Sequence, residues 1–203
     1  MRMLAFVFLA FFPSRLKVHI LRLLGHEVSK NCYIGFCYLD IRHLTIGERC
    51  HIGHGNIFTR LDRLTLAPKS RINRWNRFTS TLGVKSEFVL GEEAAVTLRH
   101  YFDCAGGIYI GARCIIAGHR SSFFTHSKGL HQKKNYFKSI RIGADNYVGS
   151  NVVAAPGFST GEKNFIGLGA VCVGELSSIS CSLLVGNPAR VKKSMPGDSP
   201  YFA

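Results

Sequence analysis

A six-residue period in the second half of the chain constrains the fold more than any other feature of the sequence. Small or apolar residues recur there every six positions, at Ile142, Val148, Ala154, Thr160, Ile166 and Cys172. Glycine directly follows four of these six residues. Such a period is neither helical nor a simple alternation, and it is typical of short strands joined by tight turns, with three strands in each coil of a solenoid. We therefore predict an all-β solenoid in which each coil stacks its inward residues on those of the coil below.

The same phase runs through the first half of the chain, with one interruption at Asp40 and a weaker middle stretch. Its members are Ile34, Ile46, Ile52, Phe58 and Leu64, then Val84, Leu90, Val96 and Phe102, and finally Ile110 and Ile116. A two-sheet sandwich with coincidental spacing is the alternative. Both of the clean stretches hold the phase for about thirty residues, which favours the solenoid.

The phase is lost between Ile116 and Ile142, where the sequence turns polar and basic and carries three histidines, His119, His126 and His131. We expect an extruded loop at about 118–140, and a loop of this kind is a better candidate for function than the ladders. The Gly-Asn-Pro turn that begins at residue 186 is expected to end the coils. The predicted parts are an N-terminal helical segment at 1–28, the β-helix at 29–185 and a tail at 186–203.

The first 28 residues contain an apolar run at 3–12 that is too short to span a bilayer. An amphipathic basic stretch follows at 14–24. The apolar face that we assign to it consists of Leu16, Ile20, Leu23 and Leu24. They allow two interpretations: an interfacial membrane anchor, or a cap over the open strand edge of the first coil.

The charge balance narrows the possible partners. There are 26 Lys and Arg against 12 Asp and Glu, a formal charge of +14, which attracts phosphates and anionic surfaces or simply keeps the protein soluble. No basic run is interleaved with stacking aromatics, so no nucleic-acid partner is expected. Seven cysteines without a C-x-x-C pair indicate neither a zinc ribbon nor a complete disulfide framework. They are expected to be reduced thiols of a cytoplasmic protein, which the basic N-terminal segment would hold at the inner membrane face.

Particular strings in the repeat resemble the hexapeptide-repeat acyltransferases, a family that includes galactoside, maltose and polysaccharide O-acetyltransferases. The resemblance covers about residues 31–193, and it is carried by the strings IGADNYVGSNVVAAPG, IGLGAVCV, VGNPARV, HYFDCAGGIYIG and FFTHS. It implies a left-handed parallel β-helix, homotrimers with active sites between neighbouring chains, and acetyl-CoA as acyl donor without a metal. The implied reaction moves an acyl group, expected to be acetyl, to a hydroxyl of a sugar or lipid-linked saccharide in surface polysaccharide biosynthesis.

The resemblance also implies roles for particular residues. His126, after Thr125, matches the catalytic histidine, although the residue that commonly separates that Thr and His is absent here. Imidazole titrates near neutral pH and suits a general base that takes the hydroxyl proton. The positions that match cofactor-binding groups are Tyr147, Ser150, Leu168, Val173, Gly174, Arg190 and Lys193. We expect the main chain at Ser150 to donate to the oxyanion. A carboxylate such as Asp103 could orient an imidazole or bind a sugar hydroxyl, and we assign His100, Asp103 and His119 to the acceptor site.

Two other functions compete with acyl transfer. β-Helical carbonic anhydrases bind zinc through three histidines, and His126 and His131 together with His100 or His119 offer such a set. A non-enzymatic scaffold would keep the coils without the chemistry.

Overall fold

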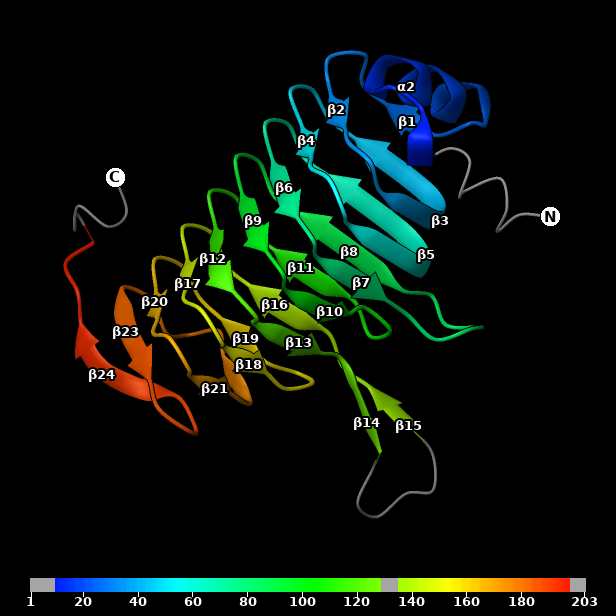
Figure 1. The fold of residues 1–203 in the computed structure, drawn as a ribbon. Helices are drawn as coiled ribbons and strands as arrows, with labels where there is room; N and C mark the ends of the chain where they lie inside the picture. Colours follow the sequence, from blue (N-terminus) through cyan, green and yellow to red (C-terminus); the bar gives the residue numbers. More distant parts are fainter. Residues whose placement is uncertain (1–9, 129–134, 198–203) are drawn as a thin grey trace.

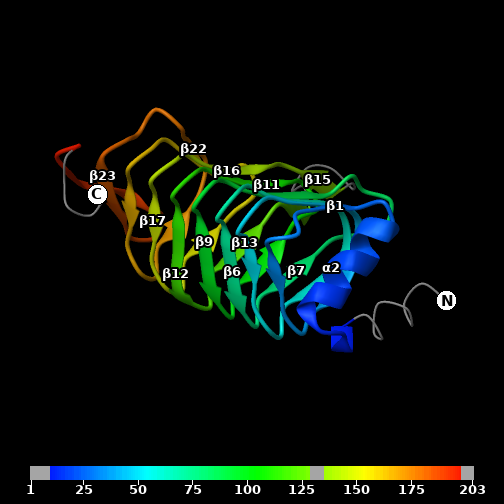
Figure 2. The same cartoon turned by 90° about the horizontal axis from the view of Figure 1, so that it is seen from above.

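The computed structural model describes residues 10–128 and 135–197, and it has the form of a three-faced β-solenoid with one helix against its first coil (Figures 1 and 2). Within the coils, each strand pairs in parallel with the strand of the coil above and below it. The predicted all-β parallel helix of six-residue repeats is therefore confirmed.

Each coil contributes one strand to each face. The first face holds β2 (Tyr33–Ile34), β4 (His51–Ile52), β6 (Arg71–Arg74), β9 (Ala95–Leu98), β12 (Ile115–His119), β17 (Tyr147–Val148), β20 (Phe165–Ile166) and β23 (Ser182–Val185). The second face holds the first parts of β3 (Tyr38–Ile46) and β5 (Ile57–Leu66), then β7 (Arg77–Thr79), β10 (Tyr101–Asp103), β13 (Ser122–Phe124), β18 (Val153–Ala154) and β21 (Val171–Cys172). The third face holds β1 (Glu27–Val28), the second parts of β3 and β5, then β8 (Glu87–Leu90), β11 (Ile108–Ile110), β16 (Ile140–Ile142), β19 (Ser159–Thr160) and β22 (Glu175–Leu176).

The interior consists of ladders of like side chains, as the period predicts. On the first face the inward residues in successive coils are Ile34, Ile52, Ile72, Val96, Ile116, Val148, Ile166 and Leu184, all buried. On the second face, four phenylalanine rings stack nearly parallel with centroids 4.5–4.8 Å apart, at Phe58, Phe78, Phe102 and Phe123. This separation matches the spacing of paired strands, so the aromatic ladder supports the register of the middle coils.

Two of the sequence expectations fail where extra residues enter a coil. Val84 lies in a loop between β7 and β8, and Phe88 and Leu90 fill the core of that coil instead. Between Ile116 and His119 the pairing with β9 shifts register, which moves the phase by one residue. Because of that shift, Ser122–Phe124 remains a regular coil strand rather than part of an extruded loop at 118–140. The excursion from the coil is a narrower antiparallel hairpin, β14 (His126–Lys128) and β15 (Asn135–Phe137), visible in Figure 1.

The N-terminal helix α2 (Ser14–Leu23) lies across the first coil, and of the four apolar side chains expected to cap it only Ile20 packs against the core. Lys17, Val18 and Leu21 are buried, whereas Leu16, Leu23 and Leu24 are exposed. The Lys17 ammonium donates to the carbonyl of Gly35, and the Ser14 hydroxyl accepts from the N–H of Ile34. These bonds satisfy main-chain groups of β2, the edge strand of the first face. Burial lowers the pKa of Lys17.

The C-terminal tail contains one further strand. β24 (Arg190–Ser194) pairs antiparallel with β23, beside the last coil strand of the first face, and its residues are exposed. All seven cysteines are free thiols, five of them buried. Within residues 10–128 and 135–197, no helix has the length and apolar character needed to cross a bilayer.

Candidate functional site

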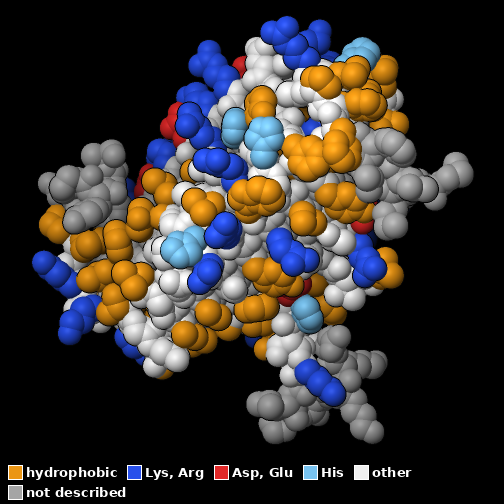
Figure 3. Space-filling view, viewed as in Figure 1, with side chains coloured by type: hydrophobic (Ala, Val, Ile, Leu, Met, Phe, Trp, Pro, Cys, Tyr) orange, Lys and Arg blue, Asp and Glu red, His pale blue; other side chains and the backbone are white. Residues whose placement is uncertain are grey.

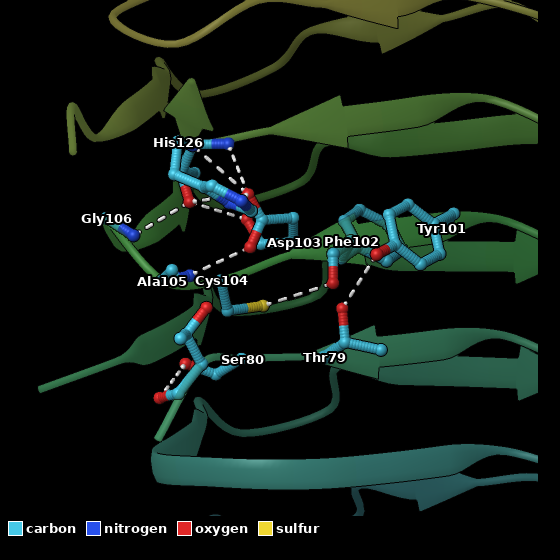
Figure 4. Close-up of polar contacts among 11 residues, drawn as sticks. Thr79, Ser80, Tyr101, Phe102, Asp103, Cys104, Ala105, Gly106 and His126 are labelled. Atoms are coloured by element: carbon cyan, nitrogen blue, oxygen red, sulfur yellow. Dashed lines mark hydrogen bonds and ion pairs between the residues drawn. The ribbon is translucent and has the colours of Figure 1, made fainter. Parts of the chain in front are cut away.

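Asp103 and His126 form a close pair at the corner between the second and third faces, which we call the second corner (Figure 4). The Asp103 carboxyl is 3% exposed, and its Oδ2 lies 2.5 Å from Nδ1 of His126. The same oxygen accepts the main-chain N–H groups of Thr125 at 3.0 Å and of His126 at 3.1 Å. A carboxylate that accepts the Nδ1–H of a histidine fixes both the ring orientation and the tautomer.

The reactive nitrogen of this pair faces outward. The His126 side chain is 39% exposed, and in the described part of the chain its Nε2 has no hydrogen-bond partner. With the proton held on Nδ1, Nε2 carries a free lone pair that can accept a proton from an incoming hydroxyl. The ring of Phe137, from β15, lies 6.0 Å from the imidazole and forms one side of its surroundings.

Thr125 anchors the start of the hairpin and so fixes the position of His126. Its hydroxyl donates to the main-chain oxygen of Asp103 at 2.7 Å and accepts the N–H of Gly106 at 2.7 Å. A Cβ on Gly106 would lie 2.8–2.9 Å from main-chain atoms of Thr125 and Lys138. The turn after β10 therefore needs glycine there, so that the two ends of the hairpin can approach.

His100 does not have the environment expected of an acceptor-binding residue. It is buried, its Nε2 lies 3.0 Å from the Thr97 hydroxyl, and its Nδ1 accepts the N–H of Ser121 at 3.1 Å. Burial, helped by the nearby charge of His119, lowers the pKa of His100 to about 4. The ring belongs to an internal polar ladder and keeps no ring nitrogen free for a substrate.

The corner between the first and second faces, the first corner, holds three of the other predicted residues. The main-chain N–H of His119 donates to the Ser150 hydroxyl at 3.3 Å, and the N–H of Gly169 donates to the Ser150 carbonyl at 2.9 Å. Leu168 precedes this contact and is 79% exposed. In the described part of the chain the main-chain N–H of Ser150 has no partner, so it is available as a donor.

The remaining predicted cofactor residues lie in the coils beyond Ser150 or next to it. Tyr147 stacks on Phe165 on the outside of the first face, with centroids 4.6 Å apart. Val173 and Gly174 follow β21, near the last coil, and Gly174 is exposed. Arg190 and Lys193 are exposed on β24. These residues follow the C-terminal half of the solenoid rather than gathering in one pocket.

The predicted residues thus divide between two corners of one chain. Asp103 and His126 lie at the second corner, whereas His119, Ser150 and Leu168 lie at the first. The strand segment between the corners, from Ser121 to Thr125, spans roughly 13 Å. A base and an oxyanion donor must each approach the reacting group to about 3 Å. One chain alone therefore does not assemble the predicted site.

Histidine geometry does not favour the zinc alternative. His131 lies outside the described residues, and His100 and His119 are at or near the first corner, away from His126. Across residues 10–128 and 135–197, no three His, Cys, Asp or Glu side chains are grouped so that they could hold a metal ion.

Comparisons with known proteins identify the fold. No protein-family model matches the sequence. No curated protein matches it either. Among solved structures, the chain is similar to a hexapeptide-repeat acetyltransferase of Vibrio cholerae complexed with acetyl coenzyme A, with 22% identity, 71% of this chain and 70% of that chain covered, and a TM-score of 0.52.

Two further structures cover more of the chain. The N-acyltransferase AntD of Bacillus cereus, in complex with dTDP-4-amino-4,6-dideoxyglucose and coenzyme A, matches at 15% identity over 88% of each chain, with a TM-score of 0.56. The polysialic acid O-acetyltransferase OatWY matches at 16% identity over 87% of this chain and 90% of its own, with a TM-score of 0.51. The protein thus has the β-solenoid fold of the hexapeptide-repeat acyltransferases.

Proposed function

We propose that this protein transfers an acyl group, acetyl in the first instance, from acyl-coenzyme A to a sugar hydroxyl during the synthesis of a surface polysaccharide. The observation that carries the proposal is the Asp103–His126 pair, a buried carboxylate holding an outward-facing imidazole on the solenoid fold of known acyltransferases. Solved neighbours are named for transfer to sugars, which supports the acceptor class.

The proposed mechanism uses His126 twice. Its Nε2 takes the proton as the sugar oxygen attacks the thioester carbon and forms the new C–O bond. The resulting oxyanion is stabilised by the main-chain N–H of Ser150, which has no hydrogen-bond partner among the described residues. When the intermediate collapses, the C–S bond breaks and the protonated imidazole returns its proton to the departing thiolate. Asp103 holds the ring throughout and stabilises the imidazolium.

We further propose a homotrimer in which the second corner of one protomer faces the first corner of the next. The separation of His126 from Ser150 within one chain supports this arrangement, because only a neighbour brings the two into one cleft. With a threefold axis along the solenoid, every coil keeps its height in each protomer. Acyl-coenzyme A would then run from Ser150 past Leu168 towards the last coil, with Arg190 and Lys193 near its phosphates.

The N-terminal helix supports a second contact, with the inner face of the membrane. At the end of α2, Leu23 is 74% exposed and Leu24, which follows the helix, is 63% exposed. Phe11, before the start of the helix, is also exposed. We expect Leu23→Ser/Leu24→Ser to weaken binding to anionic vesicles, whereas Leu82→Ser, an equally exposed leucine on a distant loop, leaves it unchanged. Equal co-sedimentation of both variants would count against the contact.

The proposed activity is tested by incubating the protein with acetyl-coenzyme A and a panel of sugars, with release of free thiol as the readout and mass spectrometry of the product. Wild type is expected to release thiol only with an acceptor and to add an acetyl ester. Thiol release that does not depend on the acceptor, or no thiol release with any acyl-coenzyme A, would refute acyl transfer. Mass spectrometry of surface polysaccharide from cells with and without the gene would then identify the natural acceptor.

A further inference from the structure

The first corner carries a row of large exposed side chains that the proposed chemistry does not use. In successive coils a residue there adopts the left-handed conformation, and these residues are Gly55, Trp75, Arg99, Arg120, Asn151 and Gly169. Main-chain hydrogen bonds link the middle of the series, since Arg99 donates to the carbonyl of Arg74, and Arg120 donates to that of Arg99. We call Trp75, Arg99 and Arg120 the corner row.

The backbone of this row favours smaller residues than it holds. A positive φ favours glycine or asparagine, and those are the residues at the two ends of the series. Arg99 and Arg120 adopt φ values of 56° and 61°, and Trp75 one of 61°. Such positions are destabilising for long side chains, which suggests that these side chains contribute something else.

Nothing else in the described chain neutralises the arginines. Within residues 10–128 and 135–197, the guanidinium groups of Arg74, Arg99 and Arg120 make no hydrogen bond or ion pair. They stand in adjacent coils, where strands lie about 4.8 Å apart, so their like charges repel. An anionic partner with several charges would relieve this repulsion. Figure 3 shows far more Lys and Arg than Asp and Glu on this side of the molecule.

The corner row lies in the same coils as the proposed acceptor site, whereas the proposed donor site lies in later coils. Arg99 belongs to the coil that contains Asp103, and Arg120 to the coil that leads into His126. In the proposed trimer the row of one protomer therefore stands level with the base of the next. The donor residues Ser150 and Leu168 lie in later coils.

The chemistry of the row fits an acidic sugar chain. Arginine pairs with carboxylates through two parallel N–H groups. The Trp75 ring lies over Gly55, one coil below Arg99, and is 58% exposed, so it offers a flat apolar surface to the C–H face of a sugar ring. Repeated carboxylates along a polymer can meet the repeated guanidinium groups.

We infer that the acceptor is an acidic polysaccharide whose carboxylates bind Arg99 and Arg120 while one of its sugars packs on Trp75. This inference rests on the proposed function for the identity of the site, but its test does not need catalysis.

The test measures binding of a fluorescently labelled oligogalacturonate to the full-length protein, with a neutral maltodextrin of matched length and an oligothymidylate as comparison probes. In Arg99→Asn/Arg120→Asn, asparagine suits the left-handed backbone, as Asn151 does in the next coil, so the fold is expected to persist. The matched control is Arg42→Gln/Arg63→Gln, which removes the same charge from exposed arginines of the third face.

We expect the row variant to bind the oligogalacturonate at least tenfold more weakly, with a melting temperature equal to or above that of wild type, while the control binds like wild type. His126→Ala should also bind like wild type, so a failure of the proposed chemistry is distinguishable from a failure of this site. The inference is overturned if the row variant keeps its affinity, if maltodextrin binds as well, or if the row variant and control lose affinity equally. Tighter, row-dependent binding of the oligothymidylate would overturn it in favour of a nucleic-acid surface.

Discussion

Two corners of the solenoid meet the same backbone demand in different ways. At the third corner, between the third and first faces, residues of successive coils also adopt positive φ, and they are Arg49, Lys69, Glu93, Arg113, Asp145, Lys163 and Cys181. From Lys69 to Lys163 the charges alternate: Lys69 lies 2.6 Å from Glu93, and Arg113 donates two hydrogen bonds to Asp145 at 2.6 and 2.7 Å. The first corner has arginines in adjacent coils, and the part of the chain that the structure describes gives them no acidic partner.

This difference separates a structural corner from a binding corner. Where alternating charges pair, the residues with positive φ stabilise the register of the stacked coils. Their charges are then explained without a ligand. Where like charges stand unpaired beside an exposed aromatic ring, the stack gains nothing from them, and a ligand explains their presence. Changes at the first corner should therefore alter binding and turnover, whereas changes at the third should alter stability alone.

The largest effect is expected from His126, which faces the first corner of a neighbour in the proposed trimer. His126→Ala should lower turnover by at least a hundredfold, because loss of a general base acts on the transition state, and should leave coenzyme A affinity nearly unchanged. Steady-state kinetics and equilibrium binding of coenzyme A measure the two quantities. If His119→Ala has this effect and His126→Ala does not, the base has been assigned to the wrong corner.

The second effect is on the pH dependence of stability. It concerns His100, a titratable side chain in the internal polar ladder behind the first corner. Its folded pKa of about 4 lies below the unfolded value of 6.5, so the unfolded state binds more protons between these values. Stability should therefore fall as pH drops from about 6.5 to 4, by about 3 kcal/mol in total. His100→Asn, which resembles the adjacent rungs Asn56 and Asn76, should flatten this slope in urea titrations at several pH values. An unchanged slope would assign the acid sensitivity to other groups.

A smaller effect should follow from crowding the donor side of the first corner. Leu168→Trp, at an exposed position, should raise the KM for acetyl-coenzyme A about tenfold, which corresponds to about 1.4 kcal/mol of binding free energy. The melting temperature should not change. Leu82→Trp, at another exposed leucine, serves as control.

The same variant tests whether sites lie between chains. When it is mixed and reassembled with His126→Ala, about a quarter of the sites should regain the wild-type KM for acetyl-coenzyme A, since a random trimer pairs an intact His126 with an intact Leu168 of its neighbour that often. No recovery after verified subunit exchange, or light scattering from an active monomer, would contradict the shared cleft.

The six-residue period predicts the ladders because an inward position can hold any small or apolar side chain and still recur every six residues. The period does not predict β13, because the bulge before His119 adds one residue and moves Phe123 out of phase. Had the phenylalanine ladder been followed through that slip, Phe102 would have paired with Phe123. Asp103 would then have been recognised as a neighbour of His126 rather than as an acceptor-binding residue.

A cap over the first coil was one of two expectations, but the residues that form it and the buried position of His100 were not predicted, for a different reason. Helical periodicity selects the apolar face of 14–24, but the edge strand beneath it needs hydrogen-bond partners, and Lys17 and Ser14 supply them. His100 looks like a surface residue in a polar string, yet its place in a ladder of internal polar side chains depends on the coil lengths around it. Neither the hydrogen-bonding needs of the edge strand nor the coil lengths around His100 produce a periodic pattern in the sequence.

The smallest effect is expected at the third corner, where Arg113→Gln removes the bidentate pair with Asp145. Asp145 is nearly buried but Arg113 is largely exposed, and ion pairs with an exposed partner contribute little to stability. The melting temperature should fall by a few degrees at low salt and by less at high salt, since ions screen the exposed partner. Arg113→Asn should lose less, because asparagine suits the φ of 54° at this position. Neither variant should change oligogalacturonate binding or turnover. A loss of either by Arg113→Gln, with the fold intact, would mean that the third corner also carries a ligand, and the division between the two corners would fail.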